Sequence, residues 1–256
     1  MKNLNKILPH GIIKKVFENV WFVEGQVTIP MPIPIPIKIS KSMTIIRNPL
    51  SNELTLVNSM PLNEEGLKEL ASLGDIKNTL RVGGFHGRDD NFYKEKFGTK
   101  IYAIEGHAYS KKFDKVPIKP ENGYLMADVL LDENSTLPIE NAYLKIFKTS
   151  NPVEAILCLD QEGGILVTGD SLQNTPVPNE FCNFFGKMMM KKMKFYKPYN
   201  IGPGWVEFAK PSLEDIRSIL DINFENVLPG HGEAVIGNAK DKYRPNIEGE
   251  RKGCHE

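Results

Sequence analysis

The sequence predicts an α/β fold of the α+β type, in which two β-sheets are faced by helices. Strand patterns come first, a helix pattern follows them, and strands and helices then recur in the second half of the chain. The composition, 41% hydrophobic and 25% charged over 256 residues, supplies enough apolar side chains for a large core. No break in composition marks a linker, so we expect one domain over residues 1–256.

Turn and cap residues define the elements of the N-terminal half. Residues 19–25 alternate as a strand, and the segments 42–47 and 53–58 predict a hairpin. Asn63 stands where an N-cap belongs and Gly74 where a C-cap belongs, with leucines at helical spacing between them. Further strands are expected at 80–82, 100–104 and 126–131, with a short helix at 89–97.

The apolar pattern returns after an irregular region at 105–140. Strands are expected at 143–147, 154–159, 164–167 and 226–228, and helices at 179–194 and 212–221. The second and third of these strands are joined across a short glycine-containing turn, which predicts an antiparallel pair.

Charge and cysteine content exclude several classes of protein. Lysine plus arginine equals aspartate plus glutamate at 32 each, so no global field attracts nucleic acid. The three cysteines, Cys158, Cys182 and Cys254, are too few and too scattered for a disulfide framework. Because no apolar run is long enough for a signal peptide or a membrane span, we expect a cytoplasmic protein. The oligomeric state is not predicted.

Four segments place polar side chains directly after expected strands, where a loop can project them. They contain His86 to Asn91, Thr149 to Asn151, Asp170 and His231. Imidazole and carboxylate together suit zinc, iron or manganese, and the neighbouring glycines let the backbone turn tightly.

The order and spacing of these segments resemble the metallo-β-lactamase superfamily. The family has an early strand like residues 20–24, a hairpin like residues 43–57, a strand followed by Gly-Asp, and a late Pro-Gly-His segment. The resemblance covers about residues 16–236 and leaves a C-terminal tail at about 237–256. It implies a four-layer αββα sandwich of two mixed β-sheets flanked by helices.

Several of the family's metal ligands are replaced in this sequence. The His-x-His-x-Asp-His loop of the family falls on His86, Arg88, Asp90 and Asn91, so two of its three histidines are lost. A further histidine falls on Ser150. The aspartate and the late histidine survive as Asp170 and His231.

By this resemblance His86 alone represents the first metal position, while Asp90, Asp170 and His231 represent the second. We therefore expect one divalent metal ion, zinc, iron or manganese, and not a dinuclear centre. Arg88 raises two alternatives, because its guanidinium could neutralise Asp90 or Asp170 without any metal, or could bind an anionic substrate. Asp90 and Arg88 are the candidate catalytic residues.

Two functional hypotheses follow. The first is a single-metal hydrolase of an ester, thioester, lactone or phosphoester. A small-molecule substrate is the partner that this hydrolase hypothesis implies. The second is a non-catalytic descendant of the fold, a binding or scaffold protein in which Arg88 replaces the metal.

Two segments of unusual composition lie outside this site. Residues 29–37 have proline at every second position, which predicts an extended, partly solvent-facing ribbon and no central strand. Residues 187–194 are rich in methionine and lysine, within a helix whose apolar side is expected to cover the sheet while the lysines reach solvent.

Overall fold

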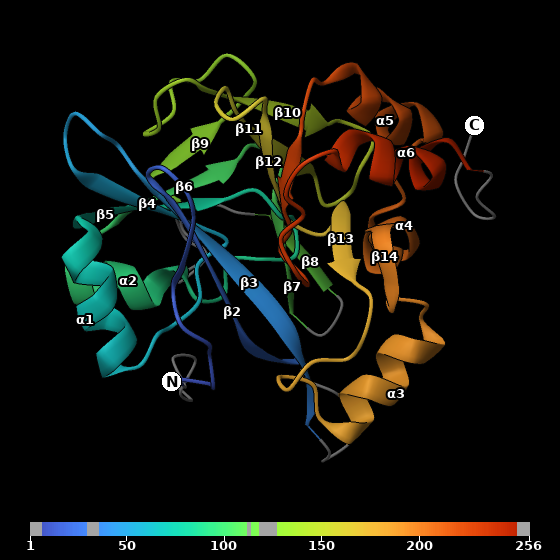
Figure 1. Ribbon diagram of the computed structural model, residues 1–256, viewed down its shortest axis with the longest axis horizontal. Coiled ribbons are helices and arrows are strands. Elements are labelled where there is room, and N and C mark those ends of the chain that lie inside the picture. Colours follow the sequence, from blue (N-terminus) through green and yellow to red (C-terminus); the bar gives the residue numbers. More distant parts are fainter. Residues whose placement is uncertain (1–6, 30–35, 112–113, 118–126, 250–256) are drawn as a thin grey trace.

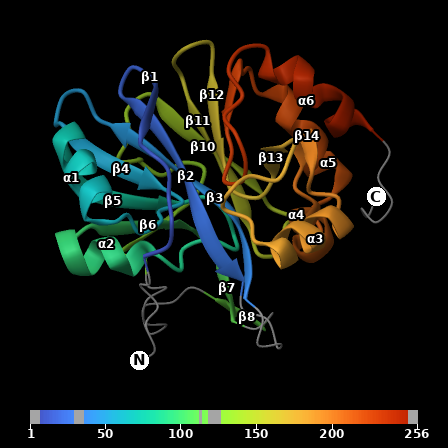
Figure 2. The ribbon, with the colours of Figure 1, turned by 60° about the horizontal axis from the view of Figure 1, so that its bottom comes forward.

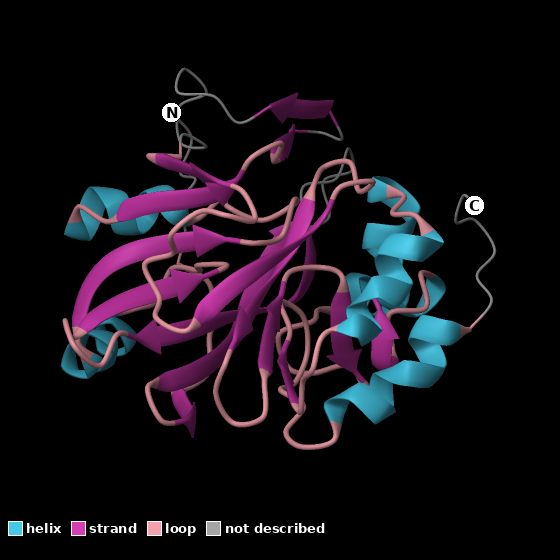
Figure 3. Ribbon diagram, turned by 90° about the horizontal axis from the view of Figure 1, so that it is seen from above, coloured by secondary structure: helices cyan, strands magenta, loops and turns pink. Residues whose placement is uncertain are grey.

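Two β-sheets packed face to face, with helices on both outer sides, form the computed structural model of the protein (Figures 1 and 3). The structure describes residues 7–29, 36–111, 114–117 and 127–249. The αββα arrangement of two mixed sheets expected from the sequence is confirmed.

The first sheet has seven strands in the order β1-β2-β3-β4-β5-β6-β9. Its strands are β1 (Lys14–Phe17), β2 (Val20–Ile29), β3 (Ile37–Arg47), β4 (Glu53–Val57), β5 (Asp75–Arg81), β6 (Lys100–Ile104) and β9 (Val129–Leu131). The pairs from β1 to β4 are antiparallel, and those from β4 to β9 are parallel. The predicted β3–β4 hairpin is confirmed, whereas β5 begins five residues before the expected residue 80.

The second sheet has four strands in the order β10-β11-β12-β15. Its strands are β10 (Ala142–Phe147), β11 (Glu154–Leu159), β12 (Ile165–Thr168) and β15 (Asn226–Leu228). The expected antiparallel pairing of β11 with β12 is confirmed, and β15 adds to β12 in parallel. Two short ladders complete the strands, β13 (Leu172–Thr175) with β14 (Lys197–Ile201) and β7 (Ala108–Lys111) with β8 (Asp114–Pro117).

The helices cover the outer faces of both sheets. On one side lie α1 (Glu64–Leu73) and α2 (Asp90–Phe97), and on the other α4 (Pro203–Ala209), α5 (Leu213–Arg217) and α6 (Ala239–Glu248) (Figure 1). The expected caps of α1 are confirmed, since the Asn63 side chain accepts the Gly66 amide proton and Gly74 ends the helix. The helix expected at 212–221 is α5 followed by a 3₁₀ turn, Ser218–Asp221.

Three apolar layers hold the sandwich together. The inner faces of the two sheets enclose a cluster that includes Val20, Leu80 and Leu157, and α1 and α2 cover another that includes Leu56 and Tyr93. The third cluster lies under α4, α5 and α6 and buries these side chains: Trp205, Ile216, Ala239, Tyr243 and Ile247. The sequence analysis assigned residues 237–256 to a tail beyond the core. In the structure α6 instead contributes three buried side chains to this cluster.

The helix α3 (Phe184–Lys192) packs beside the far end of the long β2–β3 hairpin (Figure 2). It is shorter than the expected helix at 179–194, and it buries Met190 while its lysines face solvent. Gly186 permits this packing, because a Cβ at that position would lie 2.0 Å from the Lys38 carbonyl oxygen. Of the proline-rich segment 29–37, residues 30–35 lie outside the described part, and Ile29 pairs with Ile37 in the β2–β3 ladder.

Candidate metal centre

Three of the expected ligands meet at one rim of the two sheets. His86 lies between β5 and α2, Asp170 between β12 and β13, and His231 after β15. The carboxylate oxygens of Asp170 lie 3.3 Å from His86 Nε2 and 3.1 Å from His231 Nε2. One potential ligand atom from each of these residues lies within 4.8 Å of the other two. His86 and His231 are buried and the Asp170 side chain is 13% exposed, so the group forms a largely enclosed set of one carboxylate and two imidazoles.

Close contacts between glycines bring the three loops together. A Cβ on Gly169 would lie 2.3 Å from Gly83 Cα, and a Cβ on Gly230 would lie 2.5 Å from the Gly169 carbonyl oxygen. A Cβ on Gly83 would also lie 2.7 Å from the His86 ring. Because only glycine allows main chains to approach this closely, these three residues fix the spacing of the loops that carry the ligands.

Hydrogen bonding orients one of the two imidazoles. His231 Nδ1 lies 2.7 Å from the carbonyl oxygen of Ser40 on β3, and a carbonyl can only accept, so Nδ1 carries a proton. In the neutral ring this leaves Nε2, the atom facing Asp170, with its lone pair free for a metal ion.

The electrostatics of the group favour a positive charge between its members. Burial opposes ionisation of Asp170, but the adjacent His86 and His231 outweigh burial and lower the pKa of that carboxyl. Burial also acts to lower the pKa of His231, yet its bond to Asp170 raises that pKa above the ordinary value. Burial dominates at His86, whose pKa is lowered. A buried carboxylate whose Oδ2 makes no hydrogen bond within the described residues fits a metal ion better than it fits an apolar surrounding.

Glu154 lies behind Asp170 and was not expected from the sequence. Burial, reinforced by the Asp170 charge, raises the pKa of Glu154 well above its ordinary value. Its Oε1 accepts the Ser171 amide proton. The Asp170 charge therefore favours the protonated form of Glu154.

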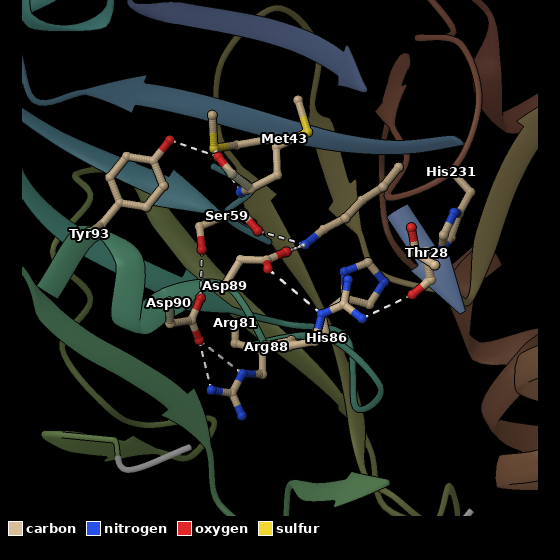
Figure 4. Close-up of polar contacts among 12 residues, drawn as sticks. Thr28, Met43, Ser59, Arg81, His86, Arg88, Asp89, Asp90, Tyr93 and His231 are labelled. Carbon is tan, nitrogen blue, oxygen red and sulfur yellow. Dashed lines mark hydrogen bonds and ion pairs between the residues drawn. The ribbon is translucent and has the colours of Figure 1, made fainter. Parts of the chain in front are cut away.

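The fourth expected ligand, Asp90, occupies a different environment (Figure 4). Its Oδ2 accepts from Arg81 Nη2 at 2.7 Å and Nε at 3.2 Å, and its Oδ1 accepts from Ser59 Oγ at 2.7 Å. The Arg81 and Asp90 side chains are both 0% exposed. Gly87 leaves room for this guanidinium, since a Cβ there would lie 1.8 Å from Arg81 Nε. Asp90, which was expected to be a metal ligand, thus forms a buried ion pair with Arg81.

Arg88 contacts neither Asp90 nor Asp170, the partners considered in the sequence analysis. Its Nη1 donates to the Thr28 carbonyl oxygen at 3.0 Å, and its Nε lies 3.8 Å from Asp89 Oδ1 (Figure 4). The closest cation to Asp89 is the buried Lys41, whose Nζ donates to Asp89 Oδ2 at 3.0 Å. Lys41 Nζ also donates to the Ser59 carbonyl oxygen at 2.6 Å.

Two further residues near the candidate metal centre, Ser150 and Asn58, have structural roles. Ser150 Oγ donates to the Pro152 carbonyl oxygen at 2.7 Å and accepts from Trp205 Nε1 at 2.8 Å, so it anchors a buried loop. The side-chain oxygen of Asn58 accepts from the Val82 and Gly83 amides at 3.3 Å. Asn58 therefore supports the loop of His86.

Arg81, Lys41 and His107 also escaped the sequence analysis. Arg81 is the last residue of β5 and Lys41 lies in the middle of β3, and sequence patterns give no sign that either cation is buried. His107 matches no position of the family pattern. It is 1% exposed, and burial, reinforced by the Arg81 charge, lowers its pKa well below the ordinary value.

Solved structures share this fold at low sequence identity. VMB-1 is 15% identical with a TM-score of 0.57, and the match covers 94% of this chain and 98% of that one. A metallo-β-lactamase from Hirschia baltica is 13% identical with a TM-score of 0.55, covering 95% and 100%. The metallo-β-lactamase FIM-1 from Pseudomonas aeruginosa, in a mono-zinc form, is 10% identical with a TM-score of 0.54, covering 96% and 97%.

Neither a family model nor a curated protein sequence matches this chain. Within the described residues, no helix combines the length and apolar character that crossing a bilayer requires. The likeness to solved structures extends over both sheets and all flanking helix layers, since it covers nearly the whole chain. The chain therefore has the metallo-β-lactamase fold.

Proposed function

We propose that the protein is a metal-dependent hydrolase with one divalent ion held by His86, Asp170 and His231. The observation that carries the proposal is the convergence of one carboxylate and two imidazoles, with ligand atoms within 4.8 Å of one another, from three separate loops. Zinc, iron and manganese suit such a set, and catalytic zinc commonly keeps three protein ligands and one open position. His86 takes the place that the sequence analysis gave to Asp90.

The residues around the group support a single ion. Within the part of the chain that the structure describes, no second group of three suitable side chains lies within ligand distance. Asp89 and Asp90 are neutralised by Lys41 and Arg81 instead. A bound divalent ion would lower the pKa of a coordinated water and polarise a carbonyl or phosphoryl oxygen, which is the chemistry of ester, thioester, lactone and phosphoester hydrolysis.

The protein's own groups would prepare the site for this chemistry. The Ser40 carbonyl oxygen keeps the Nδ1 proton of His231 in place and directs Nε2 toward Asp170. The raised pKa of Glu154 and the lowered pKa of Asp170 favour Asp170 as the charged carboxyl of the two. The low exposure of the ligand side chains would strengthen their electrostatic interaction with an ion.

The proposal is tested by metal content and by activity. Protein purified without chelators should contain about one zinc, iron or manganese per chain by elemental analysis. Asp170→Asn should weaken metal affinity by more than about 100-fold, because losing even a supporting residue of a metal site costs 10- to 100-fold. The exposed Asp160→Asn is the matched control and should keep both metal and stability. Hydrolysis of nitrophenyl esters, thioesters, lactones and phosphodiesters is then screened with the metal-loaded protein.

A non-catalytic binding protein is the alternative hypothesis. The two buried ion pairs favour it, because they satisfy the carboxylates of Asp89 and Asp90 without any metal. This alternative would be supported if the purified protein contained no metal, and if added zinc, manganese or iron neither raised the Tm nor produced hydrolysis.

A further inference from the structure

A cleft of about 430 Å³ is lined in part by the loop that carries His86. The residues that matter for its chemistry are Gln26 and Thr28 of β2, Lys38 of β3, and Arg88 and Asp89 of the loop that carries His86. Its volume falls within the range of small-molecule sites in proteins. Three of its five named side chains are charged, so the balance of these charges decides what the cleft can bind.

The two cations of the cleft are both attached to the β2–β3 strand pair, Lys38 as a member of it and Arg88 by a hydrogen bond. Thr28 and Lys38 are direct partners in the β2–β3 ladder, which places their side chains on the same face of the sheet. Arg88 Nη1 donates to the Thr28 carbonyl oxygen at 3.0 Å, so its guanidinium is held at the main chain of this strand (Figure 4). The backbone of Lys38 is fixed in turn, because its amide donates to Asn183 Oδ1 at 3.1 Å and its carbonyl oxygen accepts from the Asn183 amide at 3.2 Å.

The positive charge of these two side chains is not balanced within the cleft. Asp89 is the acidic residue that lines it, and its Oδ2 accepts from Lys41 at 3.0 Å. Arg88 Nε lies 3.8 Å from the other oxygen of Asp89, which is too long for a hydrogen bond. Among the described residues Lys38 has no carboxylate within ion-pair distance, and Arg88 remains 28% exposed. The cleft therefore has an excess of positive charge available to a ligand.

The cleft and the candidate metal centre share two pieces of backbone. Arg88 follows His86 by two residues in one loop. Lys38 precedes Ser40 by two residues in β3, and the Ser40 carbonyl oxygen accepts the His231 Nδ1 proton. Two residues of a strand span about 6.5 Å. Arg88 and Lys38 are thus each two residues along the chain from a residue that belongs to the candidate metal centre or supports it.

We propose that this cleft is an anion-binding subsite, in which Arg88 and Lys38 hold a carboxylate or phosphate group of the substrate. Anion binding depends on the cleft alone, whereas the identification of the anion as part of a substrate rests on the proposed function. Guanidinium and ammonium groups form charge-assisted hydrogen bonds with both kinds of acid. The substrate class is then an ester, thioester or lactone that bears an acidic group several bonds from the bond that is broken, or a phosphoester with such a group.

The test measures anion binding to chelator-treated protein, so that a metal cannot serve as the receptor. Inorganic phosphate and succinate are titrated at low ionic strength by isothermal calorimetry, which separates the phosphate from the carboxylate preference. Arg88→Gln and Lys38→Gln should each weaken the tighter of the two anions about five- to tenfold. Arg88→Lys should recover part of the loss, because it restores the charge but not the planar donor geometry.

The matched control is Lys77→Gln, which removes one exposed lysine from β5 and changes the net charge equally. Unchanged affinity in both cleft variants, or an equal loss in Lys77→Gln, would mean adventitious ion binding only and would overturn the subsite. Thermal unfolding of each variant checks that the fold is retained. Anion binding without hydrolysis would support the subsite and refute the proposed function. Hydrolysis without anion binding would support the proposed function and overturn the subsite.

Discussion

The buried ion pair between Arg81 and Asp90 should be essential to the stability of the protein but not to its metal content. Both side chains are 0% exposed, and the guanidinium donates through Nη2 and Nε to one oxygen of the carboxylate. Charges about 4 Å apart interact by about 4 kcal/mol at an effective dielectric constant of 20. Removing one partner leaves the other charged and buried, which costs about 3–5 kcal/mol in comparable pairs.

Arg81→Met should therefore lower the free energy of unfolding by about 3–5 kcal/mol. Asp90→Asn should also destabilise, although it keeps the hydrogen-bonding partner of Ser59 Oγ. The double variant removes both charges, so its loss should be smaller than the sum of the single losses by about 2 kcal/mol or more. Urea unfolding followed by the fluorescence of Trp21 and Trp205 measures all three values.

The exposed Arg244→Met is the control, and its unfolding free energy should match that of the wild type. If Arg81→Met cost less than about 1 kcal/mol, the buried pair would not exist in solution. If Asp90→Asn were as stable as the wild type but lost its metal, Asp90 would be a ligand and our assignment of the group would be wrong.

Two further predictions concern the packing of the ligand loops and the effect of pH. Gly169→Ala should lower both the Tm and the metal affinity, since its Cβ would lie 2.3 Å from Gly83 Cα. Gly11→Ala is the control and should change neither quantity, because its Cβ would meet no atom closer than 3.6 Å. Equal losses of Tm and metal affinity in the two variants would refute the role of close glycine contacts. Burial opposes ionisation of Asp128, but the ion pair with Lys94 lowers the pKa of this carboxyl. Asp128→Asn should therefore lower the free energy of unfolding by about 1 kcal/mol near pH 7, a value reduced because both side chains are partly exposed. Because the pKa of Asp128 is lowered in the folded state, its contribution to stability is present above about pH 4 and is lost as the pH falls further. The prediction would be contradicted if the wild type and Asp128→Asn differed in unfolding free energy by the same amount at pH 7 and pH 3, measured by urea unfolding.

Local signals in the sequence were sufficient for most of the fold. The hairpin of β3 and β4 and the capped helix α1 depend on residues close together in the chain, such as Asn63 and Gly74, and both elements were predicted. The start of β5 was missed because Asp75, Lys77 and Asn78 interrupt its apolar pattern. Its parallel partners β4 and β6 supply the ladder that the local pattern does not indicate.

The site was predicted less completely, because competition between side chains is decided in three dimensions. Asp90 occupies the expected place in the chain, but Arg81 lies closer to its carboxylate than any expected metal ligand does. Lys41 resembles an ordinary surface residue of an alternating strand, and only the burial of β3 on both faces shows that its charge requires Asp89. Order along the chain identifies which loops meet, whereas the partner of each charge depends on residues from other strands.

The glycine contacts among the three ligand loops also bear on how such a site can change over time. Because Gly83, Gly169 and Gly230 hold the loops by main-chain contact, the loop spacing does not depend on which side chain serves as ligand. Ligands can therefore be exchanged one at a time while the scaffold persists, and the metal preference can shift with the chemistry of each new donor. The same property makes the loops a suitable frame for engineered metal sites, provided that substitutions avoid the glycines themselves.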